Sequence, residues 1–317
     1  MLHKSTIKCR KVLRNIIIVT LSFVIISFAT TKIVYDNIFV RYDNEILVSS
    51  FPEEIKTTVS NALEYEFESG KNTLVGSLLR ADGGDTLIVM VPGYRAEYNE
   101  YFYIAKSFID GGYSVFLFDT TGHGESEGES SIGFSQAVID LNCAIDFIKD
   151  NKNFGFKNIV LFGHSRGGYA ACCSLKDNKN ISAVISVAGL NSAMEAVVSP
   201  AKNYVGPLAY CGYPFLWSYQ SMLFGSDITS RSAAECISDT NVPVFIAHGT
   251  KDNVVPVDKV SIMSHKSEIK RENVTYYLSD KEGENGHTDI LFGCNNRVNE
   301  NLMNEIFKFL NTAFKKG

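Results

Sequence analysis

Residues 158–168 read Asn-Ile-Val-Leu-Phe-Gly-His-Ser-Arg-Gly-Gly, and this stretch decides the fold of the 317-residue chain. Its first five residues are almost all apolar and predict a strand buried on both faces. Gly167 and Gly168 begin a segment rich in Ala and Cys, which we expect to be helical. A Gly-x-Ser-x-Gly between strand and helix is typical of a sharp turn that holds its serine strained and exposed. Ser165 is therefore the candidate nucleophile, and a glycine-rich turn with a passive serine is the alternative.

A serine hydroxyl is a weak nucleophile until a base accepts its proton. His287 is our choice among the six histidines, because it follows the last predicted strand in a glycine-containing loop that can reach the carboxyl edge of the sheet. Asp252 follows the strand at 244–247 and is the candidate acid that orients this imidazole. The chain order Ser165, Asp252, His287 is the one expected for such a turn. Nearby residues that we rank lower are Asp258, Asp289, His123, His248 and His164, which adjoins the serine but should point away from it.

Negative charge on a substrate oxygen needs two backbone N–H donors, each typically contributing roughly 3–4 kcal/mol to lowering the barrier. Arg166, directly after the candidate nucleophile, supplies one. The second is expected from the loop after the strand at 86–91, which reads Pro92-Gly93-Tyr94-Arg95. We expect Tyr94 to give this N–H and Gly93 to allow close approach of the substrate.

Short apolar runs and helical patterns alternate around the nucleophile turn. After a hairpin signal at 63–80, strands are predicted at 86–91, 113–118, 158–162, 183–188, 244–247 and 274–278. Helices are expected at 97–110, 134–150, 168–177, 257–269 and 298–316. This alternation predicts an α/β fold with a mostly parallel central sheet covered by helices on both faces.

About fifty residues between two of these strands form an insertion at about 190–240, which we call the cap. Connections in such sheets are usually short, so the cap should have its own structure. It is rich in aromatic residues and poor in charge, which suggests a site for an apolar acyl or aryl group; packing of the cap's own core is an equal alternative. The substrate-binding candidates are Gly93, Tyr204, Tyr213 and Trp217.

Charge is distributed unevenly along the chain. It has 30 Lys and Arg against 35 Asp and Glu, but five of the basic residues lie in 1–14 and the first acid is Asp36. The chain as a whole is 45% apolar and 12% aromatic, which excludes disorder, and its net charge of −5 is not the basic charge expected of a nucleic-acid-binding protein. Seven cysteines are too few for a disulfide scaffold, and the absence of Cys-x-x-Cys predicts neither a metal nor a redox site.

Residues 15–31 carry no charge and follow the basic head. A helix of these 17 residues rises about 25 Å, near the lower limit for crossing a bilayer. We expect an uncleaved single-pass anchor, with a signal peptide cleaved after Ala29 as the alternative that gives a secreted protein. Either places the body outside the cytoplasm. The expected division is an anchor or signal at 1–35, a juxtamembrane spacer at 36–60 and a catalytic domain at 61–317.

These motifs resemble those of the α/β-hydrolase superfamily over about residues 74–314. Gly163–Gly167 is similar to the nucleophile elbow, residues 119–126 (Asp-Thr-Thr-Gly-His-Gly-Glu-Ser) to its characteristic turn, and residues 249–252 to its acid loop. The closest likeness is to the esterase, monoacylglycerol-lipase and serine-aminopeptidase group, lysophospholipases included. One departure is Pro92-Gly93, where that group commonly has His-Gly.

The resemblance and the residues together predict a serine hydrolase that cleaves carboxylic esters, lipid esters among them, through an acyl-enzyme on Ser165. No cofactor is expected, and the partners are a small-molecule ester and, through residues 15–31, a membrane. The alternatives are an acyltransferase or a serine aminopeptidase on the same triad, or a membrane-tethered binding protein without turnover. The natural substrate, the acyl length and the oligomeric state are not predicted.

Overall fold

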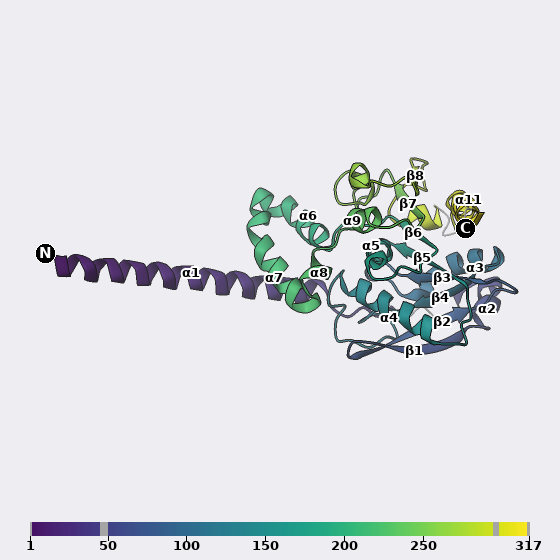
Figure 1. The fold of residues 1–317 in the computed structure, drawn as a ribbon, viewed down its shortest axis with the longest axis horizontal. Coiled ribbons are helices and arrows are strands. Elements are labelled where there is room, and N and C mark those ends of the chain that lie inside the picture. The colour runs from purple at the N-terminus through teal and green to yellow at the C-terminus, as the bar shows by residue number, and fades with distance from the viewer. Residues whose placement is uncertain (1, 45–49, 294–297, 316–317) are drawn as a thin grey trace.

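The computed structural model describes residues 2–44, 50–293 and 298–315, and an eight-stranded sheet forms its centre (Figure 1). The strand order is β1-β2-β4-β3-β5-β6-β7-β8. Strands β1 and β2 form an antiparallel hairpin, β2 pairs antiparallel with β4, and all other pairs are parallel. This confirms the predicted mostly parallel sheet. The strands are β1 (Leu63–Ser69), β2 (Asn72–Leu79), β3 (Thr86–Val91), β4 (Ser114–Phe118), β5 (Asn158–His164), β6 (Ala183–Val187), β7 (Val244–Gly249) and β8 (Val274–Ser279).

Helices cover both faces of the sheet, as the alternating pattern predicts. One face packs against α4 (Gln136–Asp150), α5 (Arg166–Cys173) and α9 (Ala233–Ser238). The other packs against α3 (Phe102–Asp110), α11 (Glu300–Lys315) and shorter elements. The central strands β3 to β7 are buried along almost their whole length, which explains their continuous apolar sequences. The short elements are α2 (Glu53–Val59), η2 (Tyr98–Tyr101), η3 (Ser174–Lys176), η5 (Met263–Glu268) and α10 (Asp289–Phe292).

The helix expected at 257–269 is wrong: this segment is a series of turns that ends in the 3₁₀ helix η5. Hydrogen bonds from serine side chains to backbone carbonyl oxygens take the place of backbone hydrogen bonds of a helix. The Ser261 hydroxyl donates to Val257 O at 2.7 Å, and the Ser264 hydroxyl donates to Ser261 O at 2.8 Å. Such bonds offer the backbone an alternative to helix, and they explain why the apolar spacing misleads here.

The insertion between β6 and β7 has two parts. Helix α6 (Ala193–Val205), the 3₁₀ helix η4 (Gly206–Gly212) and α7 (Tyr213–Phe224) project from the body as a hairpin (Figure 1). The short α8 (Ser226–Thr229) then leads back to α9, whose apolar side chains lie in the main core against α5. The projecting hairpin is the part of the cap that is free to contact something other than the sheet.

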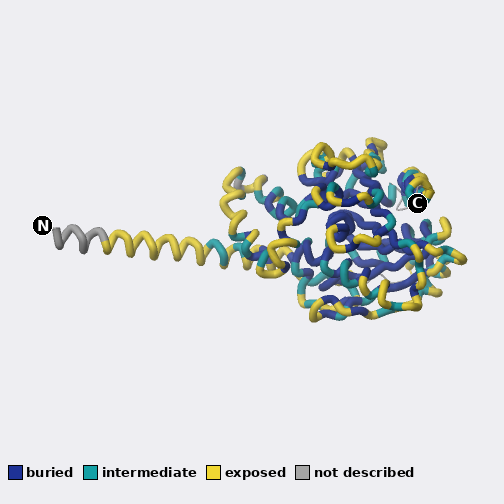
Figure 2. The backbone as a smooth tube through the Cα atoms, in the orientation of Figure 1, coloured by how far each residue is buried: buried dark blue, intermediate teal, exposed yellow. Residues whose placement is uncertain are grey.

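Helix α1 (Leu2–Ile38) extends away from the body, and the cap hairpin lies beside its last turns (Figure 1). Its segment Arg10–Ile38 contains an 18-residue window with a mean hydropathy of 2.2, and it is long and apolar enough to cross a membrane by length and composition. Figure 2 shows it exposed until it reaches the body. Residues 35–44, which we call the strap, then pack on the body: Tyr35 and Phe39 are buried, and Tyr42 N donates to Gly122 O at 3.0 Å.

Candidate active site

Ser165 lies in a strained turn between β5 and α5. Its backbone has φ 56° and ψ −117°, a conformation that non-glycine residues rarely adopt and that clusters at functional sites. The glycines around it are required by close packing. A Cβ on Gly163 would lie 2.1 Å from Gly167 O, and a Cβ on Gly167 would lie 2.1 Å from Val91 O. The sequence therefore folds here into the sharp turn that its pattern predicts, with Ser165 at the carboxyl edge of the sheet.

The loops after β7 and β8 bring Asp252 and His287 together, with His287 Nδ1 2.7 Å from Asp252 Oδ2. The same carboxylate oxygen lies 3.1 Å from His248 Nε2, and the other oxygen accepts the N–H groups of Val254 and Val255. Burial by itself raises the pKa of the Asp252 carboxyl. The hydrogen bonds from His248 and His287 outweigh burial and hold this pKa well below its usual range. The group is therefore a carboxylate at neutral pH and fixes the His287 tautomer with hydrogen on Nδ1.

His164 connects the loop of His287 to the loop after β3. Its Nε2 lies 3.0 Å from His287 O, a carbonyl that accepts, so Nε2 carries the hydrogen and Nδ1 accepts. The Tyr101 hydroxyl, 3.0 Å from His164 Nδ1, donates to it, and Gly93 N donates to the Tyr101 oxygen at 3.0 Å. Burial, and then the neighbouring His287, lower the pKa of His164 to about 3, so the ring stays neutral. The sequence alone predicts that His164 points away from the serine and indicates no role for Tyr101. Tyr101 lies in η2, an element that no local motif connects to the site.

The Tyr94 and Arg166 amides are the expected donors to a substrate oxygen. Gly93 N–H is already bonded to Tyr101, whereas among the described residues neither Tyr94 N–H nor Arg166 N–H has a protein acceptor. The loop is held close to the nucleophile, because a Cβ on Gly93 would lie 3.6 Å from Ser165 Cβ. The Arg166 guanidinium binds this loop too: it donates to Gly93 O at 2.9 Å and to Thr120 Oγ1 at 2.8 Å.

The turn at 119–126 forms a wall beside this loop. His123 is fully buried; burial and the Arg166 charge lower its pKa to about 3, so it stays neutral. Asp119 accepts the N–H groups of Glu125, within the turn, and of Tyr98, in η2. Burial raises the pKa of this carboxyl to about 7 despite these bonds. The turn is thus a packed scaffold with two buried titratable groups, His123 and Asp119.

The aromatic residues expected to bind substrate lie on the cap hairpin. Tyr204 is 88% exposed at the end of α6, and Tyr213 and Trp217 are 39% and 37% exposed on α7. Trp217 Nε1 donates to Ser230 Oγ at 3.0 Å. These three rings lie on the outer surface of the cap, whereas Gly93, the fourth candidate, lies beside Ser165.

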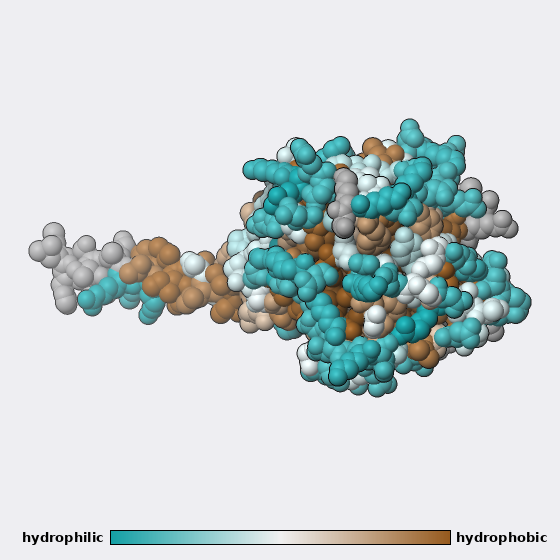
Figure 3. Space-filling view, turned by 45° about the vertical axis from the view of Figure 1, so that its right-hand side comes forward, coloured by the Kyte–Doolittle hydropathy of each residue, from teal (hydrophilic) through white to brown (hydrophobic). Residues whose placement is uncertain are grey.

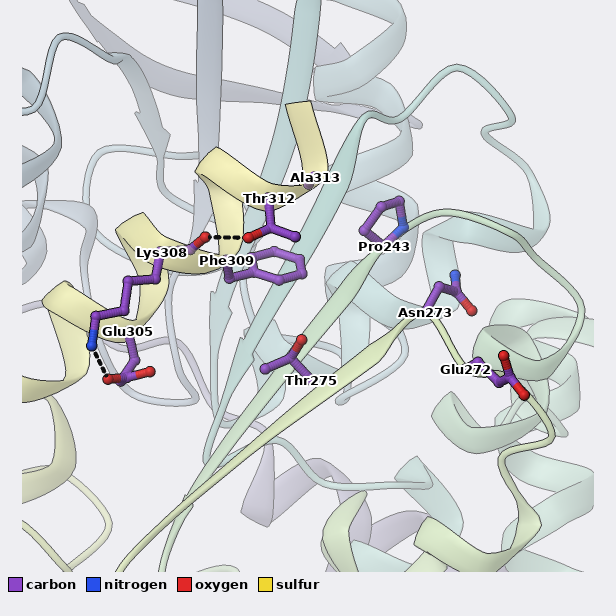
Figure 4. A pocket seen from close by; sticks show the side chains of 9 residues that line it. All are labelled: Pro243, Glu272, Asn273, Thr275, Glu305, Lys308, Phe309, Thr312 and Ala313. Atoms are coloured by element: carbon purple, nitrogen blue, oxygen red, sulfur yellow. Dashed lines mark hydrogen bonds and ion pairs between the residues drawn. The ribbon is translucent and has the colours of Figure 1, made fainter. Parts of the chain in front are cut away.

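A cavity of about 280 Å³ lies between α11 and the first residues of β7 and β8 (Figure 4). Its lining includes Phe309, Thr275 and the ion pair between Glu305 and Lys308, whose atoms lie 2.7 Å apart. Because the strands are parallel, this is the opposite edge of the sheet from Ser165. The cavity is therefore separate from the Ser165 group.

Three comparisons with known proteins agree with this architecture. A family model described as serine aminopeptidase, S33, matches residues 84–214. The uncharacterized protein YfhR of Salmonella typhi is 27% identical over 146 residues, which are 45% of this chain and 46% of that protein. The polyketide transferase grgF of a Penicillium species is 31% identical over 121 residues, 37% of this chain and 41% of that protein. The chain thus spans less than half the length of these curated relatives.

Solved structures extend the likeness to most of the chain. The Pyrococcus furiosus esterase Pf2001 matches with a TM-score of 0.64 at 18% identity, over 86% of this chain and 98% of that one. The α/β hydrolase GrgF from Penicillium sp. sh18 matches with a TM-score of 0.59 at 19% identity, over 80% of this chain and 98% of that one. At these identities the likeness establishes the fold. Together with the family match over residues 84–214, it shows that this chain has the α/β-hydrolase fold.

Proposed function

We propose that the chain is a serine esterase that cleaves carboxylic esters through an acyl-enzyme on Ser165. The observation that carries this proposal is the 2.7 Å contact of His287 Nδ1 with Asp252, in loops that end at the same sheet edge as the strained Ser165 turn. With Nδ1 bonded to Asp252, His287 Nε2 is the nitrogen left to accept the serine proton. Ser165 Oγ then bonds to the ester carbonyl carbon, the alcohol leaves with that proton, and water releases the acid by the reverse sequence.

The proposed oxyanion site consists of the Tyr94 and Arg166 N–H groups. Gly93 N–H is an unsuitable donor, because it is bonded to the Tyr101 hydroxyl. The fixed position of this loop matters chemically, because donors that are already oriented need no reorganisation when charge develops in the transition state. The Pro92-Gly93 departure from the family pattern is compatible with this arrangement, since Gly93 closely approaches Ser165.

An apolar acyl or aryl ester is the proposed substrate class. Its support is a cap hairpin in which Glu195 and Lys202 are the charged residues between 191 and 224. Transfer of the acyl group to an alcohol other than water is the second candidate, favoured by the 31% identity to a polyketide transferase. Aminopeptidase activity, as in the family description, has weaker support: the Glu195 carboxylate, the acid available in the cap hairpin to bind an amine, lies 3.8 Å from His265 Nε2.

A fluorophosphonate probe tests the nucleophile directly. We expect labelling of the wild type and none of Ser165→Ala, with Ser174→Ala, a buried serine at the end of α5, as the matched control that keeps its label. Equal labelling of wild type and Ser165→Ala would refute the proposal, and an unlabelled wild type would favour the binding protein without turnover. Hydrolysis of p-nitrophenyl esters of increasing chain length, with and without an added alcohol, then separates acyl preference and transfer from hydrolysis.

We also propose that α1 is an uncleaved single-pass anchor and that the catalytic domain lies outside the cytoplasm. The basic residues that precede the apolar segment support this orientation, since such residues stay on the cytoplasmic side. Sequencing the N-terminus of the mature protein tests it: a start at Thr30 would replace the anchor with a cleaved signal peptide.

A further inference from the structure

We propose that the tip of the cap hairpin, formed by the end of α6, η4 and the start of α7, inserts into the same lipid bilayer that α1 enters. The inserted part would lie in the leaflet on the side of the body. The first observation is an apolar surface shared by α1 and the tip. Figure 3 shows α1 apolar over most of its length, from its hydrophilic start to the body. Exposed on the tip are Tyr204, Leu208, Tyr210, Tyr213 and Trp217.

Helix α7 packs along α1, so the two enter the same environment. Phe215 lies against Phe23, with ring centroids 6.1 Å apart and edge-to-face geometry. Tyr219 lies in the same way against Phe28, at 5.8 Å. Phe23 belongs to the uncharged run of α1, 15–31, so the start of α7 lies at the level of apolar residues that need a non-aqueous surrounding.

Polar groups mark where the bilayer ends. Lys32 and Asp36 form an ion pair at the end of the apolar run, and the Tyr219 hydroxyl donates to Asp36 Oδ1 at 2.6 Å. Lys32 Nζ also lies 3.4 Å from the Tyr219 oxygen. This cluster joins α1 to α7 at one level, and its charges belong in the headgroup region.

The depth of the tip follows from helix geometry. Tyr213 lies six residues before Tyr219 in α7, which corresponds to about 9 Å along the helix. Elements that lie in a membrane interface bury their apolar side about 5–10 Å into the headgroup and acyl boundary, so the tip has the matching reach. Lys202, a cation of the cap hairpin, places its Nζ 4.4 Å from the centre of the Tyr210 ring, an arrangement in which a long side chain can direct its charge toward the headgroups.

The inserted tip is connected to the candidate active site through the strap. From the Asp36–Tyr219 level the chain continues to Ile38, whose carbonyl accepts the Tyr94 hydroxyl, and to Phe39, whose ring lies 5.5 Å from that of Tyr94. Tyr94 is the proposed oxyanion donor. The contacts of Ile38 and Phe39 with Tyr94 therefore connect the part of the chain at the headgroup region to the proposed reaction centre. This step rests on the proposed function and implies esters that lie in the bilayer as the substrate class.

Trp217 makes insertion measurable, because it is the only tryptophan of the chain. The test uses the full chain in phosphatidylcholine vesicles, with lipids brominated either near the glycerol end or near the terminal methyl of the acyl chain. Trp217 lies two residues from Tyr219, about 3 Å along α7, and should be interfacial. We expect at least twofold stronger quenching by the shallow bromines than by the deep ones. No quenching by either lipid would overturn the proposal.

A charge at the tip provides the matched comparison. Leu208→Asp introduces a carboxylate at a 70% exposed position of η4, and Leu278→Asp introduces the same group at a 52% exposed position of β8. We expect the first to lose at least half of the shallow quenching and the second to lose none, since α1 anchors both. Equal quenching in the two variants would overturn the insertion of the tip. Ser165→Ala should quench like wild type, so loss of esterase activity and loss of insertion are distinguishable failures.

Discussion

Two regions of the molecule meet at Tyr94 and are built in different ways. The edge of the sheet that we propose to be catalytic, called the catalytic edge below, consists of the Ser165 turn and the loops that carry Asp252 and His287. Each follows a parallel strand, of which β5 and β7 are buried and β8 is partly exposed. The strap, residues 35–44, has no strand behind it. It is held by aromatic contacts and by Arg41, which donates to the carbonyl oxygens of Gly124, Ser126 and Gly128.

The difference shows what holds the functional side chains in position in each region of this fold. At the catalytic edge the sheet register fixes three loops relative to one another, so short motifs suffice to place the reacting groups. The strap reaches its position through contacts with residues more than 50 positions away in the chain. We therefore expect substitutions at the catalytic edge to act on catalysis and substitutions in the strap to act on stability and on access from the membrane.

Asp252→Asn should have the largest effect. The amide cannot stabilise the imidazolium and favours the wrong His287 tautomer, so kcat should fall on the order of 10⁴-fold, as in other enzymes with this triad. Steady-state hydrolysis of a p-nitrophenyl ester measures this change. Asp36→Asn, the equivalent change within the strap, is the control and should retain kcat within about threefold. A comparable loss in both variants would contradict the separation of the two regions.

Asp119 lies in the turn that Arg41 holds, and it should make stability depend on pH. Its folded pKa of about 7 lies above the usual value of 3.8, so the folded state retains a proton that the unfolded state loses. The free energy of unfolding should therefore fall as pH rises from about 4 to about 7, by up to about 4 kcal/mol, and level off above. Denaturant unfolding across this range measures the slope.

Asp119→Asn should remove this slope while retaining one acceptor for the backbone N–H groups of Tyr98 and Glu125. Asp252, whose pKa is lowered, has the opposite sign: its contribution is present above the unfolded pKa and is lost as pH falls below it. An unchanged slope in Asp119→Asn would assign the effect to another group.

Tyr101→Phe tests the hydrogen bonds that join the two catalytic loops. The change leaves Gly93 N–H and His164 Nδ1 without their partner, at about 1–3 kcal/mol for a buried group. We expect kcat to fall about 5- to 150-fold with little change in KM, because the loop is needed for the oxyanion and not for substrate binding. Tyr98→Phe is the control, because its hydroxyl lies 3.5 Å from Ser77 Oγ on β2, outside the two loops. Equal effects on kcat in both variants would indicate a merely structural role.

The sequence predicted the strand, the turn and the helix start around Ser165 because the signals for these elements are local. The run from Asn158 to Gly168 contains strand, turn and helix start in order, and the structure forms all three. The strap was expected to be a spacer, since neither periodicity nor a motif indicates that Phe39 will contact Phe134 and Tyr94. His164 was expected to point away from the site, yet its hydrogen bonds to Tyr101 and His287 depend on loops from three strands. Contacts of this kind are set by packing and leave no pattern in one stretch of chain.

Tyr219→Phe should have the smallest effect. It tests most directly whether the strap and the catalytic edge act independently. It removes the 2.6 Å hydrogen bond to Asp36 and leaves the ring contacts with Phe28 and Tyr35 intact. The bond is partly exposed, so its loss should destabilise the junction of α1 and α7 by about 1 kcal/mol or less. Faster thermolysin cleavage in the cap hairpin, with kcat on a soluble ester unchanged within about twofold, is the expected outcome. Tyr210→Phe, at an exposed hydroxyl of the same hairpin, should leave both rates unchanged. A loss of kcat as large as that of Tyr101→Phe would mean that strap and catalytic edge work as one unit, because the Asp36–Tyr219 contact would then position Tyr94 for catalysis.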